Sequence, residues 1–235
     1  MTRIGIVKPG STYAEMIEEF GDYDAWFARV LEPLGVECAS WMAGPDSMPD
    51  PQRADGWIVT GARGSVHEED EGVERLLEWI RSVVRAEAPF LGVCYGHQAV
   101  CAALGGTVER HPGGWELGTT EVGLTGAGRK DPLFEGFPDR FEVQTTHEDR
   151  VARMPPDATL LATNAHTEVQ ATALGAAIRS VQFHPEVTPE IAADFADRRR
   201  HLLPEPARID EAPWGERVLS NFVENFVRRR ASASG

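Results

Sequence analysis

A cysteine stands between two glycines in the stretch Gly92-Val93-Cys94-Tyr95-Gly96, where an apolar strand pattern gives way to a helix pattern. This arrangement is typical of a nucleophile elbow, a tight strand-to-helix turn that exposes the nucleophile and leaves room only for glycine beside it. The free N–H groups and the positive dipole end of the helix favour the thiolate, which is the reactive form. Taken alone, the pattern also fits a cysteine that packs at the end of a core strand.

A second group that could carry chemistry is His184-Pro185-Glu186, which follows an apolar stretch at residues 176–183. The carboxyl ends of parallel strands share one edge of a sheet, so His184 could meet Cys94 there and act as its base. Glu186 could accept a hydrogen bond from the other imidazole nitrogen and fix the tautomer. An isolated His-Pro-Glu is typical of a polar turn, but both patterns at strand ends in one chain indicate a nucleophile–His–acid triad.

Four segments of the chain, in the same order, resemble the class I (triad) glutamine amidotransferase family. The elbow is similar to the family's Gly-x-Cys-x-Gly motif, and the later pair is similar to its His-x-Glu motif. Residues 57–66 resemble the family's oxyanion strand and loop, and residues 144–151 resemble its His-x-Asp-x-Val segment beside the substrate. The resemblance covers about residues 4–186 and continues more loosely to the helix near Asn221-Phe222.

The resemblance implies a reaction in which the Cys94 thiolate attacks the side-chain amide of glutamine, or of another γ-glutamyl compound, while His184 transfers protons. Glu186 completes the catalytic set. Ammonia or an amine leaves, and water then cleaves the γ-glutamyl thioester to release glutamate. The family binds the tetrahedral oxyanion with two backbone N–H groups, which correspond here to those of Ala62 and Tyr95.

The same resemblance assigns residues that contact the substrate. Gly61 belongs to the oxyanion loop, and Gln98, one helical turn beyond Cys94, matches a position that contacts the bound glutamine. His147 and Asp149 are placed beside the substrate. These last two could also be taken for an alternative base and orienting acid, but the resemblance favours the substrate-side position.

Two departures from the family pattern bear on the substrate and on the thiol. Gly61-Ala62-Arg63 stands where amidotransferases with a synthetase partner commonly carry Gly-Gly-Pro, which indicates an oxyanion loop of different shape or a different substrate. His97 occupies a position that is often apolar in the family. It either tunes the thiol or has a structural role such as capping the helix, and the structural role is favoured because His184 already supplies a base.

Composition restricts the partners. The net charge of −14 argues against nonspecific nucleic-acid and anionic-membrane binding, and the arginine runs at 198–200 and 228–230 are expected to complement helix carbonyl ends rather than to bind a partner. The three cysteines show neither disulfide nor zinc spacing, and no P-loop or dinucleotide motif is present, so we expect no metal and no cofactor. Neither a membrane helix nor a signal peptide is evident, which favours a cytoplasmic location.

Alternating strand and helix patterns predict an α/β fold: a flavodoxin-like open sheet, mostly parallel, with helices on both faces and a small antiparallel extension. Parallel strands are expected at residues 4–7, 36–42, 58–61, 90–93 and 176–183. Antiparallel strands are expected at residues 116–124, 141–145, 159–163 and 168–173. Helices are expected at residues 12–34 with an interruption near Gly21, at 72–86, from the elbow to Gly105, and at 214–230, with an exposed link at 203–213.

We expect one domain over residues 1–235, with a catalytic core at about 4–202 and a C-terminal helix at about 214–230, because 42% hydrophobic residues can bury one substantial core. No acceptor-activating domain is attached, so two enzymes remain open. One is a glutaminase that delivers ammonia to a separate synthetase subunit, which the Cys-Tyr-Gly-x-Gln elbow favours. The other is a freestanding γ-glutamyl peptidase or hydrolase. The intact triad argues against a noncatalytic binding or regulatory protein on the same fold.

Overall fold

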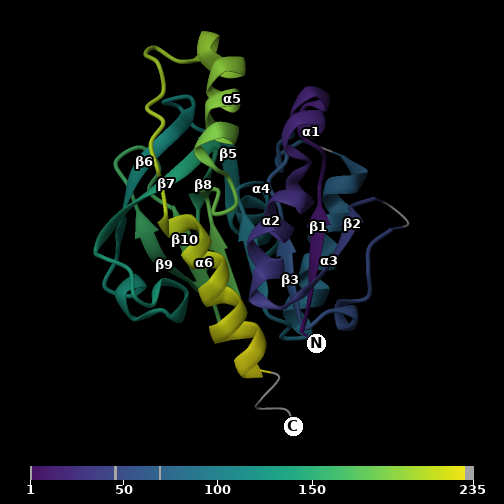
Figure 1. The fold of residues 1–235 in the computed structure, drawn as a ribbon. Coiled ribbons are helices and arrows are strands. Elements are labelled where there is room, and N and C mark those ends of the chain that lie inside the picture. The colour runs from purple at the N-terminus through teal and green to yellow at the C-terminus, as the bar shows by residue number, and fades with distance from the viewer. Residues whose placement is uncertain (1, 45–46, 69, 231–235) are drawn as a thin grey trace.

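Parallel strands carry the elbow at the middle of a nine-stranded sheet in this computed structural model, which describes residues 2–44, 47–68 and 70–230 (Figure 1). The parallel strands lie in the order β2 (Glu37–Met42), β1 (Arg3–Lys8), β3 (Gly56–Val59), β4 (Phe90–Val93) and β11 (Ile178–Val181). Every residue of β3, β4 and β11 is buried, as expected of apolar strands with both faces covered. The strands that end at the elbow and at His184 are therefore direct neighbours.

Helices cover both faces of this parallel half. Successive strand residues point to opposite faces, so Ile58 packs in one core and Val59 in the other. Helices α2 (Tyr23–Leu31) and α6 (Trp214–Phe222) pack on the Ile58 face, and α3 (Glu71–Arg85) and α4 (Tyr95–Ala103) pack on the Val59 face. Helices α1 (Ala14–Phe20) and α5 (Pro189–Arg199) contribute to a third, smaller core. In the described ranges, none of the helices is both long and apolar enough to span a membrane.

Beyond β11 the sheet continues with antiparallel strands. Their order is β10 (Ala171–Leu174), β9 (Ala158–Thr163), β6 (Glu116–Leu124) and β7 (Arg140–His147). Strand β7 also reaches back to the parallel half, because the His184 N–H donates to the Gln144 carbonyl oxygen at 2.8 Å. A separate two-stranded sheet pairs β5 (Thr107–Arg110) with β8 (Asp149–Arg153). This hydrogen bond joins the antiparallel half to His184, three residues beyond the end of β11.

The predicted fold class, a flavodoxin-like α/β sheet with helices on both faces and an antiparallel extension, is confirmed. The interruption expected near Gly21 is the end of α1, where Gly21 has a φ of 80°. The helix expected at 214–230 consists of α6 and a π-helical segment, Val223–Arg228. Strand β10 begins at Ala171, later than the predicted start at residue 168.

Two features of the extension differ from the sequence prediction. Strands β5 and β8 were not predicted, because β5 is largely exposed and shows no alternation of apolar and polar residues. The link at residues 203–213 is mostly exposed, as expected, but it is held against β6. There the Thr119 N–H donates to the Arg208 carbonyl oxygen at 2.7 Å. The link therefore lies against the sheet before the chain enters α6.

The elbow depends on close backbone contact between α4 and the strands beneath it. A Cβ atom at Gly96 would lie 2.2 Å from the carbonyl oxygen of Val59, and one at Gly92 would lie 2.4 Å from the carbonyl oxygen of Gly96. These distances are too short for any side chain, so both positions require glycine. The two glycines of the motif thus let the helix lie directly on the sheet.

We expect Gly96→Ala to lower the free energy of unfolding by about 2–4 kcal/mol, because its Cβ atom would overlap the Val59 backbone. Alanine is a better helix former than glycine, so propensity alone would have the opposite effect. Gly126→Ala is the matched control, since a Cβ atom at Gly126 meets nothing within 4 Å. Urea unfolding of both variants measures the difference, and equal stabilities would contradict this account of the elbow.

Candidate active site

Cys94 lies at the turn between β4 and α4 and is 6% exposed. Its backbone has φ 51° and ψ −101°, a conformation that residues with a side chain rarely adopt. The turn is held on both sides: the Cys94 N–H donates to the Val181 carbonyl oxygen at 2.9 Å, and the Gly96 N–H donates to the Thr60 carbonyl oxygen at 3.2 Å. The thiol therefore sits directly before Tyr95, the first residue of the helix, whose N–H group has no partner within the helix and can stabilise a thiolate.

His184 and Glu186 follow β11, the strand beside β4. The Nδ1 atom of His184 is 2.8 Å from Oε1 of Glu186, and both residues are buried. Gly61 lies between this ring and the thiol. A Cβ atom at Gly61 would be 2.8 Å from Cε1 of His184 and 3.7 Å from Cβ of Cys94, so the two side chains are close to each other. The structure thus brings the three residues of the expected triad together at the carboxyl edge of the parallel strands.

Neighbouring charges determine the protonation of His184. Burial disfavours the imidazolium, but the negative charges of Glu186 and the Cys94 thiolate outweigh it and raise the pKa of His184 to about 10. The backbone of the acid is also fixed, because the Arg29 guanidinium donates to the Glu186 carbonyl oxygen at 2.9 Å. At neutral pH the site therefore holds a proton that His184 can pass to a leaving group.

A cavity of about 150 Å³ opens beside Cys94. Ala62 and Tyr95, the expected oxyanion donors, both line it. Tyr95 is the first residue of α4, so its N–H has no partner within the helix. Gly61, which precedes Ala62, packs against the ring of His184. Backbone N–H groups next to a nucleophile are the donors that a developing oxyanion requires.

Gln98, His147 and Asp149 line the same cavity, but their polar atoms are largely engaged by the protein. The side-chain amide of Gln98 donates to the Asp149 carbonyl oxygen at 3.0 Å. Both ring nitrogens of His147 face acceptors, namely the Asp149 carbonyl oxygen at 3.0 Å and Oε2 of Glu116 at 2.9 Å. These three residues form part of the cavity wall, and their hydrogen bonds join β7, β8 and α4.

His147 and Asp149 do not form a second base and acid pair. The Asp149 carboxylate lies 3.5 Å from Nδ1 of His67, and His147 is paired with Glu116 instead. Burial opposes ionisation of Glu116, but the hydrogen bond from His147 holds the pKa of that carboxyl below its ordinary value. The buried pair of His147 and Glu116 therefore fixes His147 in the cavity wall.

His97 has a structural role, although not the expected one of capping the helix. Its ring is fully buried, and Nδ1 lies 2.7 Å from the hydroxyl of Ser180, which lies 2.7 Å from the hydroxyl of Thr172. Burial and the nearby His147 lower the pKa of His97 to about 3, so the ring is neutral at neutral pH. His97 therefore ties α4 to strands β11 and β10.

Arg199 is a cavity residue that its place in an arginine run does not predict. We expected it to complement the carbonyl end of α5, but it is only 7% exposed and lines the cavity. Its guanidinium carbon lies 4.7 Å from the ring centroids of both Trp115 and Phe195, and Nη1 donates to the hydroxyl of Thr146 at 2.9 Å. Nothing in the run of three arginines marks the middle one. Its place depends on how the antiparallel half folds over α5.

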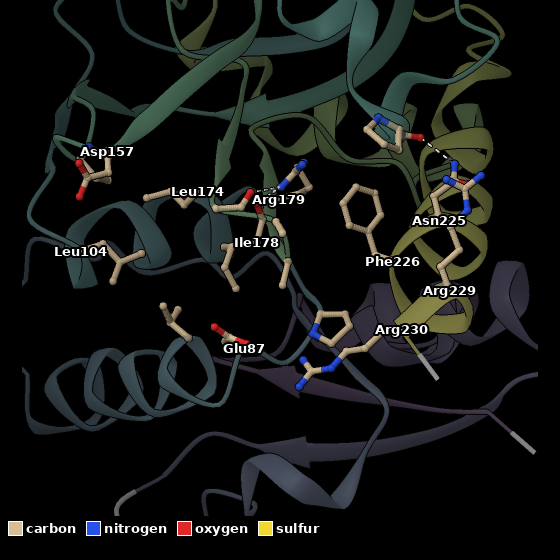
Figure 2. Close-up of a pocket in the computed structure, with 17 residues that line it drawn as sticks. Glu87, Leu104, Asp157, Leu174, Ile178, Arg179, Asn225, Phe226, Arg229 and Arg230 are labelled. Atoms are coloured by element: carbon tan, nitrogen blue, oxygen red, sulfur yellow. Dashed lines mark hydrogen bonds between the residues drawn. The ribbon is translucent and has the colours of Figure 1, made fainter. Parts of the chain in front are cut away.

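A larger cavity of about 920 Å³ lies between the end of α3, the β10–β11 hairpin and the segment after α6 (Figure 2). Leu104, Leu174 and Phe226 are among the apolar residues that line it, and Glu87 and Arg229 are among the charged ones. Its described lining includes no Cys, His, Ser or Thr. This lining therefore offers no thiol, hydroxyl or imidazole, and thiol chemistry belongs to the smaller cavity, which Cys94 lines.

Comparisons with known proteins place the chain in a family. Residues 16–195 match the profile described as "Glutamine amidotransferase class-I". A GMP synthase (glutamine-hydrolyzing) from Thermotoga maritima is 32% identical over 209 residues, which are 88% of this chain but 35% of that protein, so the chain spans about a third of this relative's length. Gamma-glutamyl peptidase 4 from Arabidopsis thaliana is 25% identical over 240 residues, which are 97% of this chain and 95% of that protein.

Solved structures show the same fold. A glutamine amidotransferase from Thermotoga maritima aligns with a TM-score of 0.76 at 20% identity and covers 96% of this chain and 98% of that one. A glutamine amidotransferase from Methylobacillus flagellatus aligns with a TM-score of 0.75 at 18% identity and covers 96% of each chain. The likeness therefore includes both the parallel and the antiparallel halves of the sheet.

We expect His184 to carry protons on both ring nitrogens at pH 8, because the pKa of His184 is raised to about 10. Imidazole NMR of protein labelled with ¹⁵N-histidine measures this directly. His97 is the internal control, since its pKa is lowered to about 3 and its ring should remain neutral at pH 5. A His184 ring that titrates near its ordinary value of 6.5 would contradict the coupling to Glu186 and Cys94.

The same shift predicts a pH dependence of stability. The folded-state pKa of His184 lies above 6.5, so its protonation stabilises the fold fully below pH 6.5, and this contribution is lost as the pH rises through about 10. Replacing the acid in Glu186→Gln should weaken this dependence. Urea unfolding at pH 6.5 and pH 10 compares the two proteins, and an identical loss of stability in both would count against the role of Glu186.

Proposed function

Because the chain belongs to the class I glutamine amidotransferase family, we propose that it hydrolyses γ-glutamyl amide bonds through a thioester on Cys94, with glutamine as the first candidate substrate. The observation that carries the proposal is the buried His184–Glu186 pair next to the thiol. The other ring nitrogen of His184, Nε2, is buried without a nitrogen or oxygen partner in the described part of the chain, and Cys94 is among the groups that raise the pKa of this ring.

Acylation follows from this arrangement. The Cys94 sulfur attacks the side-chain carbonyl carbon, and the N–H groups of Ala62 and Tyr95 bind the oxyanion as it forms. The C–N bond then breaks, and His184 gives its proton to the leaving nitrogen, which departs as ammonia from glutamine or as an amine from another γ-glutamyl compound. Glu186 stabilises the imidazolium before this transfer and fixes the ring for the next step.

Deacylation uses the same groups in reverse. His184, now neutral at Nε2, takes a proton from water as the water attacks the thioester carbonyl carbon. The C–S bond breaks, glutamate is released, and the thiolate–imidazolium pair is restored. The proposed contacts with the glutamyl group are Gly61, Gln98, His147 and Asp149, three of which line the cavity.

Two destinations for the nitrogen follow from the relatives. The similarity to GMP synthases supports a first candidate, a glutaminase whose ammonia passes to a separate synthetase subunit. The end-to-end similarity to a γ-glutamyl peptidase supports a second candidate, a freestanding enzyme that cleaves γ-glutamyl peptides. Arg63, which stands where synthetase-partnered members commonly have proline, favours the second candidate because it adds a positive charge to the cavity lining.

We expect Cys94→Ala to abolish glutamate release from glutamine and from γ-glutamyl peptides, because no thioester can form. Mass spectrometry of reactions with each substrate measures glutamate and any adduct on the protein. Cys38→Ser is the matched control, since Cys38 is half-buried in β2, away from the cavity. Full activity of Cys94→Ala would refute the proposed nucleophile.

We expect Glu186→Gln to reduce kcat by about 10²- to 10⁴-fold while the protein stays folded, because the imidazolium of His184 loses its carboxylate partner. The loss should appear in kcat more than in KM, since Glu186 contacts His184 rather than the cavity. Steady-state glutamate release over a range of substrate concentrations separates the two constants. A change confined to KM would assign Glu186 to substrate binding instead.

A further inference from the structure

Arg199 presents a buried positive charge to the cavity that holds Cys94. No carboxylate of residues 2–44, 47–68 and 70–230 lies within 4.0 Å of its guanidinium, which instead stacks on aromatic rings and donates to the hydroxyl of Thr146. A guanidinium that is 7% exposed and has no carboxylate partner among the described residues is costly to bury. An anionic ligand group in the cavity would remove this cost.

Arg63 adds a second guanidinium to the same place. It follows Ala62 in the oxyanion loop, lines the cavity, and is exposed, which puts it at the mouth. Its guanidinium carbon lies 4.0 Å from the ring centroid of Tyr13, and that of Arg199 lies 5.6 Å from the same centroid. Arg63 likewise has no ion-pair partner in the part of the chain that the structure describes. The Tyr13 ring therefore contacts two arginines that have no carboxylate partner among the described residues, and both line the cavity beside Cys94.

The cavity lining also contains the cation Arg110 and acidic side chains, among them Glu148, Asp149 and Glu68. Arg110 is neutralised by Glu148, at 3.3 Å, and Asp149 lies 3.5 Å from His67. Glu68 also lines the cavity, and no cation among the described residues lies within ion-pair distance of it. The cavity thus offers acidic oxygens that suit one ammonium group, and two arginines that suit carboxylates.

Glutamine does not match this set of charges. It carries one ammonium and one carboxylate, so its net charge is zero, and its leaving group, ammonia, has no carboxylate. A γ-glutamyl amino acid carries one ammonium and two carboxylates. The second carboxylate belongs to the amino acid that leaves, and it lies a few bonds from the reacting carbonyl carbon. Arg63, one residue beyond the proposed oxyanion donor Ala62, is positioned for a group at that distance.

We propose that Arg63 and Arg199 form an anion subsite for the carboxylate of an amino acid joined to the γ-glutamyl group, so that the preferred substrates are γ-glutamyl amino acids or short γ-glutamyl peptides. The inference rests on the proposed hydrolysis through Cys94 and specifies its substrate class. The chemistry is unchanged: the amide C–N bond breaks, and the amino acid leaves with the proton from His184. A charge-assisted hydrogen bond to the carboxylate adds to binding in both ground and transition states.

The test compares two substrates that differ only in this carboxylate, γ-glutamylglycine and γ-glutamylglycinamide, with glutamine as a third. We expect kcat/KM of the unaltered protein to be about 10- to 100-fold higher for the acid than for its amide, the range for a hydrogen bond between charged groups. Arg63→Gln should reduce this ratio several-fold, because only Arg199 would then meet the carboxylate, and Arg63→Lys should restore part of it. Arg199→Gln should act in the same direction, but Arg199 is buried, so the exposed Arg63 gives the deciding variant.

Arg198→Gln is the matched control. Arg198 also stacks on Tyr13, with its guanidinium carbon 5.0 Å from the ring centroid, but it is paired with Asp194 and does not line the cavity. Its substitution should leave the ratio unchanged. Equal kcat/KM for acid and amide in the unaltered protein, with glutamate released from both, would overturn the subsite and leave the proposed hydrolysis intact. No glutamate from any of the three substrates would overturn the proposed function, and the subsite with it.

Discussion

The close contact between α4 and the sheet is the constraint on which the site depends. Gly92 and Gly96 let the helix backbone touch the strands, and the turn between them forces Cys94 to a φ of 51°. A larger residue at either glycine would lift the helix, relax the turn and redirect the thiol. The same contact puts the start of the helix, with the N–H group of Tyr95, beside the sulfur. Backbone strain, direction of the thiol and local electrostatics therefore have one common cause.

The antiparallel half of the sheet serves the site as a wall rather than as a second source of reactive groups. It supplies Trp115, just before β6, and Thr146 of β7, which hold Arg199, and the buried pair of Glu116 and His147. The His184–Gln144 backbone hydrogen bond joins this wall to the triad.

Local patterns in the sequence were sufficient to predict the elbow, the parallel strands around it and the meeting of Cys94 with His184, because strand ends of a parallel sheet share one edge. They were not sufficient for Arg199, which has the same neighbours in sequence as two exposed or half-buried arginines. They also failed for β5, whose pairing with β8 rests on long-range contacts and not on an apolar pattern. What sequence misses here is created by the packing of distant segments.

The pairing of β4 with β11 has a consequence for the order in which the chain acquires its reactivity. Phe90 pairs with Ile178, and the whole antiparallel half lies between them in sequence. During synthesis the elbow cysteine therefore emerges long before its base and acid. A contact of such large sequence separation carries a large loop-closure entropy cost, which slows folding. Until β11 is inserted beside β4, Cys94 has neither His184 nor Glu186 next to it, so the candidate site is assembled only when the sheet closes.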